Sequence, residues 1–311
     1  MTATVDIILV SYNTADYTVR ALSSVYKETQ KYGFTITVVD NNSSDHSVAL
    51  IQENFPNIRL IQSNQNLGFA RAVNLAASYA DAPYLLLLNP DTVVLEGAID
   101  KLVEFAGKHP ENKIWGGITL NNDLSINTHN AWAEESIKTL LFSLFGLNRL
   151  FKNSCFFNQA NYGCWQRDTV KSVDILQGSF FLTKRSLWQK LNGLDERFFM
   201  YAEEADYCYR ARKLGCQPLI TPQAKIIHHG GSSEKNLSGK MIRLLSGKVT
   251  FINKHHQQWK RIIMKVLLLL YVHNKWLITA LLALFRPAKK TLRNEWWKVL
   301  KASPIWLKGY Q

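Results

Sequence analysis

The sequence has few cysteines, and their spacing excludes a zinc site. Four occur among 311 residues, at Cys155, Cys164, Cys208 and Cys216. None of them forms the closely spaced pairs that hold structural zinc. A cytosolic chain keeps its thiols reduced, so we expect four free cysteines, with Cys208 and Cys216 as small core residues.

Three other features are also missing. An apolar run begins at residue 5 with no basic segment before it, so we expect no signal peptide and a cytoplasmic protein. The chain has no internal repeat and no low-complexity segment. Its first apolar run leads into Ser11-Tyr12-Asn13-Thr14, where a dinucleotide-dependent dehydrogenase would need a G-x-G-x-x-G turn.

Acidic residues are almost absent from the last quarter of the sequence. From Lys235 onward there are 16 Lys and Arg and one acid, Glu295, a net charge of +15. Because the whole chain carries +13, residues 1–234 carry −2. We therefore expect a near-neutral globular domain over residues 1–235, a boundary in the Gly- and Ser-containing residues 230–234, and a basic amphipathic helical region over 236–311.

No apolar stretch of the basic region is long enough to cross a bilayer without interruption. His273-Asn274-Lys275 divides residues 266–285, and a central lysine costs about 2.5 to 3.5 kcal/mol on insertion. Each remaining piece is shorter than the ~20 residues required. We therefore expect these helices to lie in the membrane interface. The alternative is a helical cap packed on the domain. The region contains no recognisable nucleic-acid-binding module, so we expect no nucleic-acid partner. Basic residues and tryptophans suited to anionic headgroups are Arg286, Lys289, Lys290, Arg293, Lys298, Lys301 and Lys308 with Trp296, Trp297 and Trp306.

Apolar runs alternate with stretches of helical spacing in the first 110 residues. The strand-like runs are 6–10, 34–39, 58–61 and 84–88, and the helical stretches are 17–26, 47–55 and 70–80. This alternation predicts an α/β fold with βαβ units and a parallel sheet. Residues 1–110 form a nucleotide-binding half, and further strands are expected at 114–120 and 173–183. The aromatic-rich residues 140–165 are interpreted as a substrate-facing insertion, with a core role as the alternative.

Asp91 follows the most apolar of these runs. Four consecutive leucines, 85–88, indicate a strand buried on both faces, and ligands in open α/β sheets bind at the carboxyl ends of strands. A carboxylate there suits a hard cation held against a diphosphate. Asp91 could instead be the N-cap of a following helix.

Two further segments suit ligand binding. Asp40 ends the second apolar run, where its carboxylate could accept the imide N–H of uracil or thymine, while Ser44 or Asp45 caps the next helix. Gly68 precedes a helical stretch and permits close backbone approach. That helix start, together with Arg71, favours a phosphate.

Acids gather at residues 203–206, and a histidine ends a later apolar run. Glu203, Glu204 and Asp206 follow four bulky apolar residues, and crowded carboxylates beside apolar groups have raised pKa values, as a general base near neutral pH requires. They also suit the first turn of a helix. His228 could complete a metal shell beside Asp91, although a structural role is the alternative.

Together these segments resemble the inverting family 2 glycosyltransferases of the GT-A fold, in their bacterial rhamnosyltransferase-like branch. The matches occur in the family's order over roughly residues 5–235: VSYN at 10–13, VDNNS at 39–43, NLGFA at 66–70, LNPD at 88–91, QGSFF at 177–181, YAEEAD at 201–206 and HHGGSS at 228–233. The resemblance implies a mainly parallel central sheet flanked by helices. Residues 1–110 would bind the nucleotide and 111–235 the acceptor.

The resemblance also implies roles for individual residues. Asp91 and His228 would hold a divalent metal, Mg²⁺ or Mn²⁺, and Glu204 would be the catalytic base. Residues implied to bind the donor nucleotide are Ser11, Tyr12, Asn13, Asp40, Asn66, Gly68, Arg71 and Asn89, with Asp40 at the base. In two places the sequence departs from the family pattern. Asn89 replaces the first aspartate of an aspartate-any-aspartate motif, which keeps ribose hydrogen bonding possible but removes a charge. Glu204 stands where aspartate is common, so Asp206 or Glu203 could be the base.

The implied reaction is a single in-line displacement that inverts the anomeric carbon. We expect transfer of a sugar, with L-rhamnose from dTDP-rhamnose favoured and a UDP-sugar open, to a lipid-linked glycan at the inner face of the cytoplasmic membrane. The product would serve O-antigen, capsule or cell-wall biosynthesis. The alternative is a catalytically silent nucleotide-sugar or lipid-binding module, which the acids at 203–206 argue against.

Overall fold

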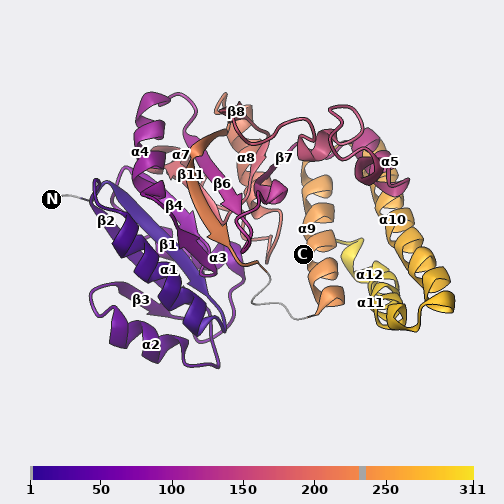
Figure 1. The fold of residues 1–311 in the computed structure, drawn as a ribbon, viewed down its shortest axis with the longest axis horizontal. Helices are drawn as coiled ribbons and strands as arrows, with labels where there is room; N and C mark the ends of the chain where they lie inside the picture. The colour runs from indigo at the N-terminus through magenta and orange to yellow at the C-terminus, as the bar shows by residue number, and fades with distance from the viewer. Residues whose placement is uncertain (1–2, 231–235) are drawn as a thin grey trace. The chain divides into compact units, whose positions relative to one another are not determined.

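The computed structural model describes residues 3–230 and 236–311 (Figure 1). Contacts divide the chain into two units. The sheet unit comprises Met1–Trp132, Gln166–Glu196 and Glu203–Ser233, and the helical unit comprises Ala133–Trp165, Arg197–Ala202 and Glu234–Gln311. Most of the boundary expected at 230–234, and residues 231–233 of the HHGGSS segment, lie outside the described residues.

A nine-stranded mixed sheet forms the centre of the sheet unit, in the order β3-β2-β1-β4-β10-β6-β11-β5. Its parallel half consists of β1 (Val5–Ser11), β2 (Phe34–Asp40), β3 (Arg59–Gln62) and β4 (Tyr84–Leu88). The strand β10 (Phe180–Lys184) runs antiparallel between β4 and β6 (Ile114–Leu120). The strand β11 (Leu219–His228) is parallel to β6 and antiparallel to β5 (Thr92–Val94) and β8 (Lys171–Ser172).

Helices flank this sheet because each presents an apolar stripe. In α1 (Ala15–Glu28), Thr18, Ala21, Leu22 and Val25 are buried at the three- to four-residue spacing of a helix face. The other helices of the unit are α2 (Ser47–Asn54), α3 (Phe69–Ala77), α4 (Ala98–Lys108), α7 (Arg185–Lys190) and α8 (Glu203–Lys213). The predicted α/β fold with a mainly parallel first half is confirmed.

The strand expected over residues 173–183 is divided in two. Residues Ile175–Leu176 form β9, which pairs with β7 (Ala131–Trp132) in a separate two-stranded sheet, and only β10 joins the main sheet. The 3₁₀ helix η1 (Thr128–Asn130) precedes β7. An apolar run alone does not show which sheet a strand joins, because both sheets bury the same residue types.

The helical unit has its own apolar core. It contains α5 (Ile137–Leu144), α6 (Leu147–Leu150), α9 (Leu237–His255), α10 (Gln258–Phe285), α11 (Lys290–Lys301) and α12 (Ser303–Trp306), with the 3₁₀ helices η2 (Gln159–Asn161) and η3 (Pro287–Lys289). Trp296 and Trp306 are buried in this core, so the expectation that they face lipid is wrong. Trp297 is 41% exposed.

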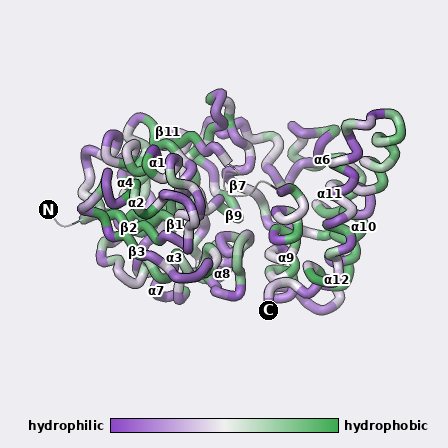
Figure 2. Tube along the Cα trace, turned by 90° about the horizontal axis from the view of Figure 1, so that it is seen from below, coloured by the Kyte–Doolittle hydropathy of each residue, from purple (hydrophilic) through white to green (hydrophobic). Residues whose placement is uncertain are grey.

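The helix α10 continues through the polar residues that were expected to divide it. It has 28 residues and is apolar along most of its length (Figure 2). Among residues 3–230 and 236–311, it is the one helix long and apolar enough to cross a membrane. The Asn274 side chain donates a hydrogen bond to the Leu144 carbonyl at 2.9 Å. This contact gives a polar residue inside an apolar helix a partner within the unit.

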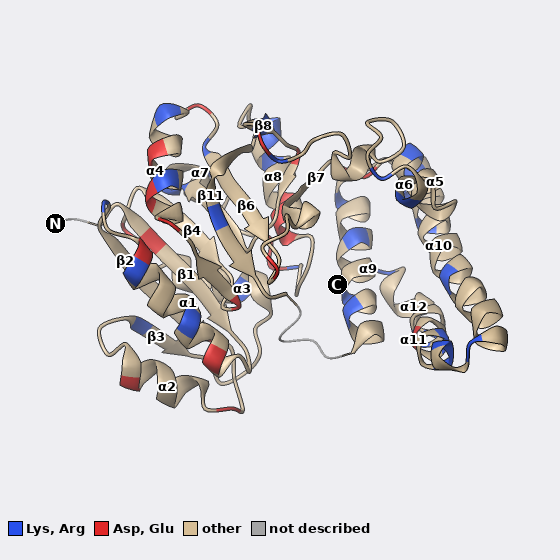
Figure 3. Cartoon of the chain, viewed as in Figure 1, with Lys and Arg blue, Asp and Glu red and all other residues tan. Residues whose placement is uncertain are grey.

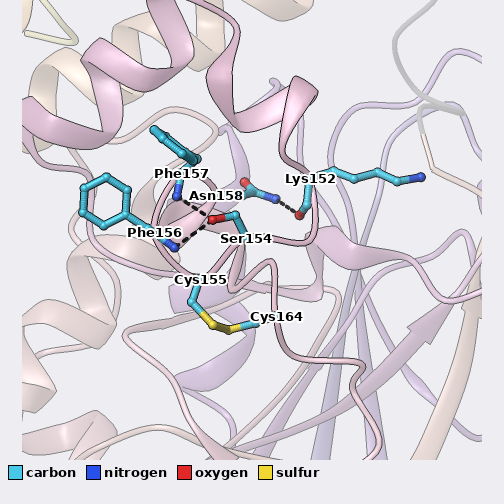
Figure 4. The surroundings of a disulfide bond; sticks show 7 residues. All are labelled: Lys152, Ser154, Cys155, Phe156, Phe157, Asn158 and Cys164. Carbon is cyan, nitrogen blue, oxygen red and sulfur yellow. Dashed lines mark hydrogen bonds between the residues drawn. A yellow bond between two sulfur atoms is a disulfide. The ribbon is translucent and has the colours of Figure 1, made fainter.

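The aromatic-rich segment is closed by a disulfide between Cys155 and Cys164 (Figure 4). The expectation of four free thiols is therefore wrong for this pair, because the turn at Ser154 brings two residues nine positions apart to a Cα–Cα distance of 5.0 Å. The Ser154 hydroxyl accepts backbone N–H bonds from Phe156 and Phe157 (Figure 4). Cys208 and Cys216 are free and buried, as expected.

The close approach of β6 to β11 depends on Gly117. A Cβ atom there would overlap the Ala224 carbonyl oxygen and lie 2.8 Å from the Phe180 ring. We expect Gly117→Ala to lower the free energy of unfolding by about 1 to 3 kcal/mol, as overpacking does, in a urea titration. Gly107→Ala, at an exposed helical position with open space around it, should raise that free energy by up to about 1 kcal/mol. Equal stability of the two variants would contradict this role for Gly117.

Candidate active site

Asp91 and His228 meet at the carboxyl edge of the sheet. Antiparallel pairing places His228, the last residue of β11, opposite Thr92, the first residue of β5. Asp91 Oδ1 lies 3.1 Å from His228 Nε2, and Asn89 Nδ2 lies 3.2 Å from the same nitrogen. The N-cap interpretation of Asp91 is wrong, because a strand follows it and the next helix begins at Ala98.

The side chains at this point fit a divalent cation. Both Asp91 and His228 are only 9% exposed, and a carboxylate with an imidazole suits ions such as Mn²⁺. In the tautomer with its proton on Nδ1, His228 Nε2 carries a lone pair and accepts a hydrogen bond from the Asn89 amide. A metal ion would bind the same lone pair. No group of three His, Cys, Asp or Glu side chains suited to a metal occurs among the described residues, so a cation would need further ligands from a diphosphate and water.

Asp40 presents a buried acceptor two strands away. It ends β2 beside Ser11 of β1, and its side chain is almost fully buried. Oδ2 accepts the backbone N–H of Ser43 at 3.0 Å, whereas Oδ1 receives no hydrogen bond from the residues the structure describes. A buried acceptor without a donor is costly, so this oxygen is suited to a ligand N–H.

Several residues expected at the nucleotide are held by the protein itself. The Ser11 hydroxyl is buried against Thr14 and Thr18. Asn13, at a positive φ of 54°, accepts the backbone N–H of Ser44. These side chains shape the turn after β1 and leave Tyr12, 38% exposed, on its surface.

The loop that enters α3 is fastened in the same way. Asn66 Oδ1 accepts the N–H of Gly68 and a hydrogen bond from Asn41 Nδ2, while Asn41 Oδ1 accepts the N–H of Leu67. Gly68 has a φ of 76°, a conformation that favours glycine. Arg71 is exposed beside Glu196, with a 3.7 Å separation of Nε and Oε2. Asn66 and Gly68 therefore fix the loop that leads into α3, whose first turn carries Arg71.

The three acids of α8 have different surroundings. Burial raises the pKa of Glu203 well above its ordinary value, and the negative charge of Glu204 raises it further. Asp206 is fully buried and bound by Arg210 Nε at 2.7 Å. Arg210 also donates to the carbonyl groups of Leu191 and Gly193. The Asp206 charge is thus compensated, whereas Glu203 and Glu204 crowd one another.

Three buried polar atoms were not singled out from the sequence. Gln177 Oε1, Ser179 Oγ and His229 Nε2 lack a hydrogen-bond partner among the described residues. Ser179 lies beside the Asn89–Asp91 turn, since its carbonyl accepts the N–H of Asn89 at 3.2 Å. The QGSFF segment contained Gln177 and Ser179, but no sequence pattern indicated that their side chains would be buried without partners.

The sheet unit also has a cavity away from these residues. It has a volume of about 560 Å³ and is lined in part by Asn74, Arg185 and Trp188. The Arg185 N–H bonds to the Pro83 carbonyl, just before β4 begins, so this cavity lies toward the amino end of the strand that leads to Asp91. Its lining does not include Asn89, Asp91 or His228.

The sheet topology and the clustered polar residues at its carboxyl edge define a transferase domain of the GT-A fold. The sequence model of glycosyl transferase family 2 matches residues 6–206, more than half of the chain. The chain therefore belongs to glycosyltransferase family 2, as the motifs predicted, and is a hexosyltransferase of glycan biosynthesis.

Named relatives agree with this assignment. The N-acetylglucosaminyl-diphospho-decaprenol L-rhamnosyltransferase of Mycobacterium tuberculosis is 25% identical over 278 residues, covering 84% of this chain and 88% of the relative. The rhamnosyltransferase WbbL of Escherichia coli K12 is 26% identical over 251 residues, covering 76% and 88%. The mannosyltransferase PcManGT of Pyrobaculum calidifontis, whose structure was solved with GDP-Man and Mn²⁺, has the same fold, with a TM-score of 0.59. It is 16% identical in sequence, and the match covers 99% of this chain and 88% of that one.

The ion pair of Asp206 with Arg210 should stabilise the fold. Arg210→Met leaves a buried carboxylate without its partner, so we expect the free energy of unfolding in urea to fall by about 3 to 5 kcal/mol. Lys213→Met, at an exposed position of the same helix, should change that free energy by less than about 0.5 kcal/mol. An unchanged midpoint for Arg210→Met would show that Asp206 does not depend on this pair.

Proposed function

We propose that this protein is a metal-dependent, inverting glycosyltransferase that uses a pyrimidine nucleoside-diphosphate sugar and a lipid-linked glycan acceptor. The observation that carries the proposal is the convergence of Asn89, Asp91 and His228 at one edge of the sheet. An imidazole and one carboxylate give an incomplete cation shell, and the oxygens of a donor diphosphate suit the remaining positions.

The surroundings of Asp40 support a uracil or thymine base. Its Oδ1 is buried at the end of β2, two strands from the strand that leads to Asp91, and the imide N–H of either base is a donor that would satisfy it. We propose dTDP-rhamnose as the donor because two curated relatives are named rhamnosyltransferases. The name of the mycobacterial relative includes a decaprenol diphosphate, which supports a lipid-linked acceptor here.

In the proposed reaction Glu204 is the base. Burial and the charge of Glu204 raise the pKa of Glu203 and so favour its protonated form, and its hydrogen bond to Glu204 leaves Glu204 to accept the proton of the acceptor hydroxyl. That oxygen forms a bond to the anomeric carbon as the bond to the diphosphate oxygen breaks, which inverts the configuration. The cation held by Asp91 and His228 would supply stabilisation of the charge on the leaving diphosphate.

Removing the Asp91 carboxylate tests the metal role. We expect Asp91→Ala to lower the rate of nucleoside diphosphate release with dTDP-rhamnose and bacterial membranes by about a thousandfold, since metal ions contribute several kcal/mol to such reactions. EDTA should abolish the wild-type activity, and Mn²⁺ or Mg²⁺ should restore it. Asp123→Ala, at an exposed loop position, should retain the wild-type rate. Full activity of Asp91→Ala in EDTA would rule out the metal role.

We further propose that the helical unit binds the cytoplasmic face of the membrane. One face of α10 is buried against α5, α9 and α11, and the opposite face is exposed. A helix packed in this way is not surrounded by lipid, so it suits the interface better than a transmembrane position. Lys and Arg dominate the charged residues of α9 to α11 (Figure 3), which favours anionic lipid. Exposed apolar residues of α10 are Trp259, Ile262, Ile263, Val266, Leu270, Leu277, Ile278, Leu281, Leu282, Leu284 and Phe285.

Flotation with vesicles tests this surface. We expect the protein to float with vesicles of phosphatidylcholine and phosphatidylglycerol, and less with phosphatidylcholine alone. Leu277→Glu with Leu281→Glu should weaken binding at least about 100-fold, because two buried leucines contribute roughly 3 to 6 kcal/mol together. Leu214→Glu, an exposed leucine of the sheet unit, is the control. Equal flotation of the double variant and the control would exclude α10 as the contact.

A further inference from the structure

The residues before the proposed base belong to the helical unit. Arg197–Ala202 packs with α9 and the residues after α12, although Glu203, the next residue of the chain, begins α8 in the sheet unit. Tyr201 and Ala202 both have positive φ angles, 69° and 71°. Two consecutive side-chain-bearing residues in the left-handed region are strained, and surrounding contacts must hold them there.

The helix α9 supplies one of these contacts. It passes so close to the segment that a Cβ atom on Gly247 would overlap the Tyr201 carbonyl oxygen and lie 3.0 Å from the carbonyl carbon. It would also lie 3.4 Å from the Ala202 Cβ. Only glycine at this position of α9 leaves room for the backbone of Tyr201.

Tyr310 supplies a second contact, from the residues after α12. Its hydroxyl lies 2.8 Å from the Met200 carbonyl oxygen and 3.1 Å from the Arg243 carbonyl oxygen, to which it can donate. The Tyr310 backbone N–H donates to the Thr250 hydroxyl at 2.7 Å, which fixes the ring beside α9. The hydroxyl therefore ties Met200, the residue before the strained pair, to the helix.

We propose that Tyr310 and Gly247 are positioning residues for catalysis, which hold Met200–Ala202 so that the first turn of α8 presents Glu203 and Glu204 in their working geometry. This inference rests on the proposed role of Glu204 as the base. It gives the helical unit a part in the chemical step in addition to membrane binding.

The contact is separable from the stability of the helical unit. The core of that unit is built on Val249, Leu268, Trp296 and Trp306, and the Tyr310 hydroxyl lies outside it. Removing this one oxygen leaves the ring in place. Tyr310→Phe is therefore a fair test of positioning, because it deletes a hydrogen bond without opening a cavity.

Steady-state kinetics of the full-length chain with dTDP-rhamnose and membranes tests the inference. We expect Tyr310→Phe to lower kcat by about three- to tenfold, the equivalent of one hydrogen bond. The KM for the donor should stay within about twofold, because the donor site is untouched. Tyr79→Phe, which removes a hydroxyl from a 50% exposed tyrosine, should match the wild type. Gly247→Ala should lower kcat further, because the backbone of Tyr201 has to move.

The pH profile separates positioning from general destabilisation. Burial keeps the pKa of Glu203 raised, so a loosened first turn of α8 admits water and lowers the apparent pKa of the Glu203–Glu204 pair. In Tyr310→Phe, the acidic limb of the plot of kcat against pH should then move to lower pH, while the melting temperature stays unchanged. The inference would be overturned if Tyr310→Phe left both kcat and the acidic limb of its pH profile unaltered. It would also be overturned if kcat fell only because the melting temperature had fallen.

Glu204→Gln in the same assay distinguishes the two proposals. If Glu204→Gln is inactive and Tyr310→Phe behaves as wild type, the base assignment stands and the positioning inference fails. If Glu204→Gln retains full activity, the proposed base is wrong, and the inference that rests on it fails with it.

Discussion

The antiparallel pairing of β5 with β11 is the constraint on which the candidate active site depends. Asp91 and His228 are 137 positions apart in the chain, and the register that sets Thr92 opposite His228 brings their side chains to 3.1 Å. The same pairing lets the His229 N–H donate to the Asp91 carbonyl. The short β5 thus makes a loop carboxylate part of a fixed pair, whose side chains need little further ordering to bind a ligand together.

Three carboxylates of the sheet unit, those of Asp40, Glu203 and Asp206, are buried in different surroundings. Asp206 shows how this protein stabilises a buried acid, with a bound arginine that also reaches two carbonyl groups. Asp40 has one oxygen without a donor among the described residues, and the pKa of Glu203 is raised by burial and a like charge. Asp206 is thus compensated by an arginine, whereas Asp40 Oδ1 lacks a donor among the described residues and Glu203 lies beside a like charge, surroundings that are common at functional sites.

Much of the fold was predictable because its strands are local patterns. The runs at 84–88 and 114–120 became strands with those same limits, and the ordered motifs indicated the family correctly. Long-range features were not predictable in the same way. Whether Asp91 is followed by a helix or a strand depends on β11, and the burial of Trp296 and Trp306 depends on packing against α9 and α10. The pairing of Cys155 with Cys164 depends on a turn that no periodicity indicates.

The basic region illustrates how one pattern can have two meanings. Its apolar residues were assigned to lipid on composition, yet the structure divides them between a protein core and an exposed face of α10. Charge and hydropathy do not distinguish these faces, because both are apolar and both lie among lysines. The division follows from spacing: Met264, Leu268 and Val272 recur every four residues and are buried, while Val266, Leu270 and Leu277 follow a parallel row and stay exposed. The helix α10 therefore contributes one face to the core of the helical unit and presents a second apolar face outside that core.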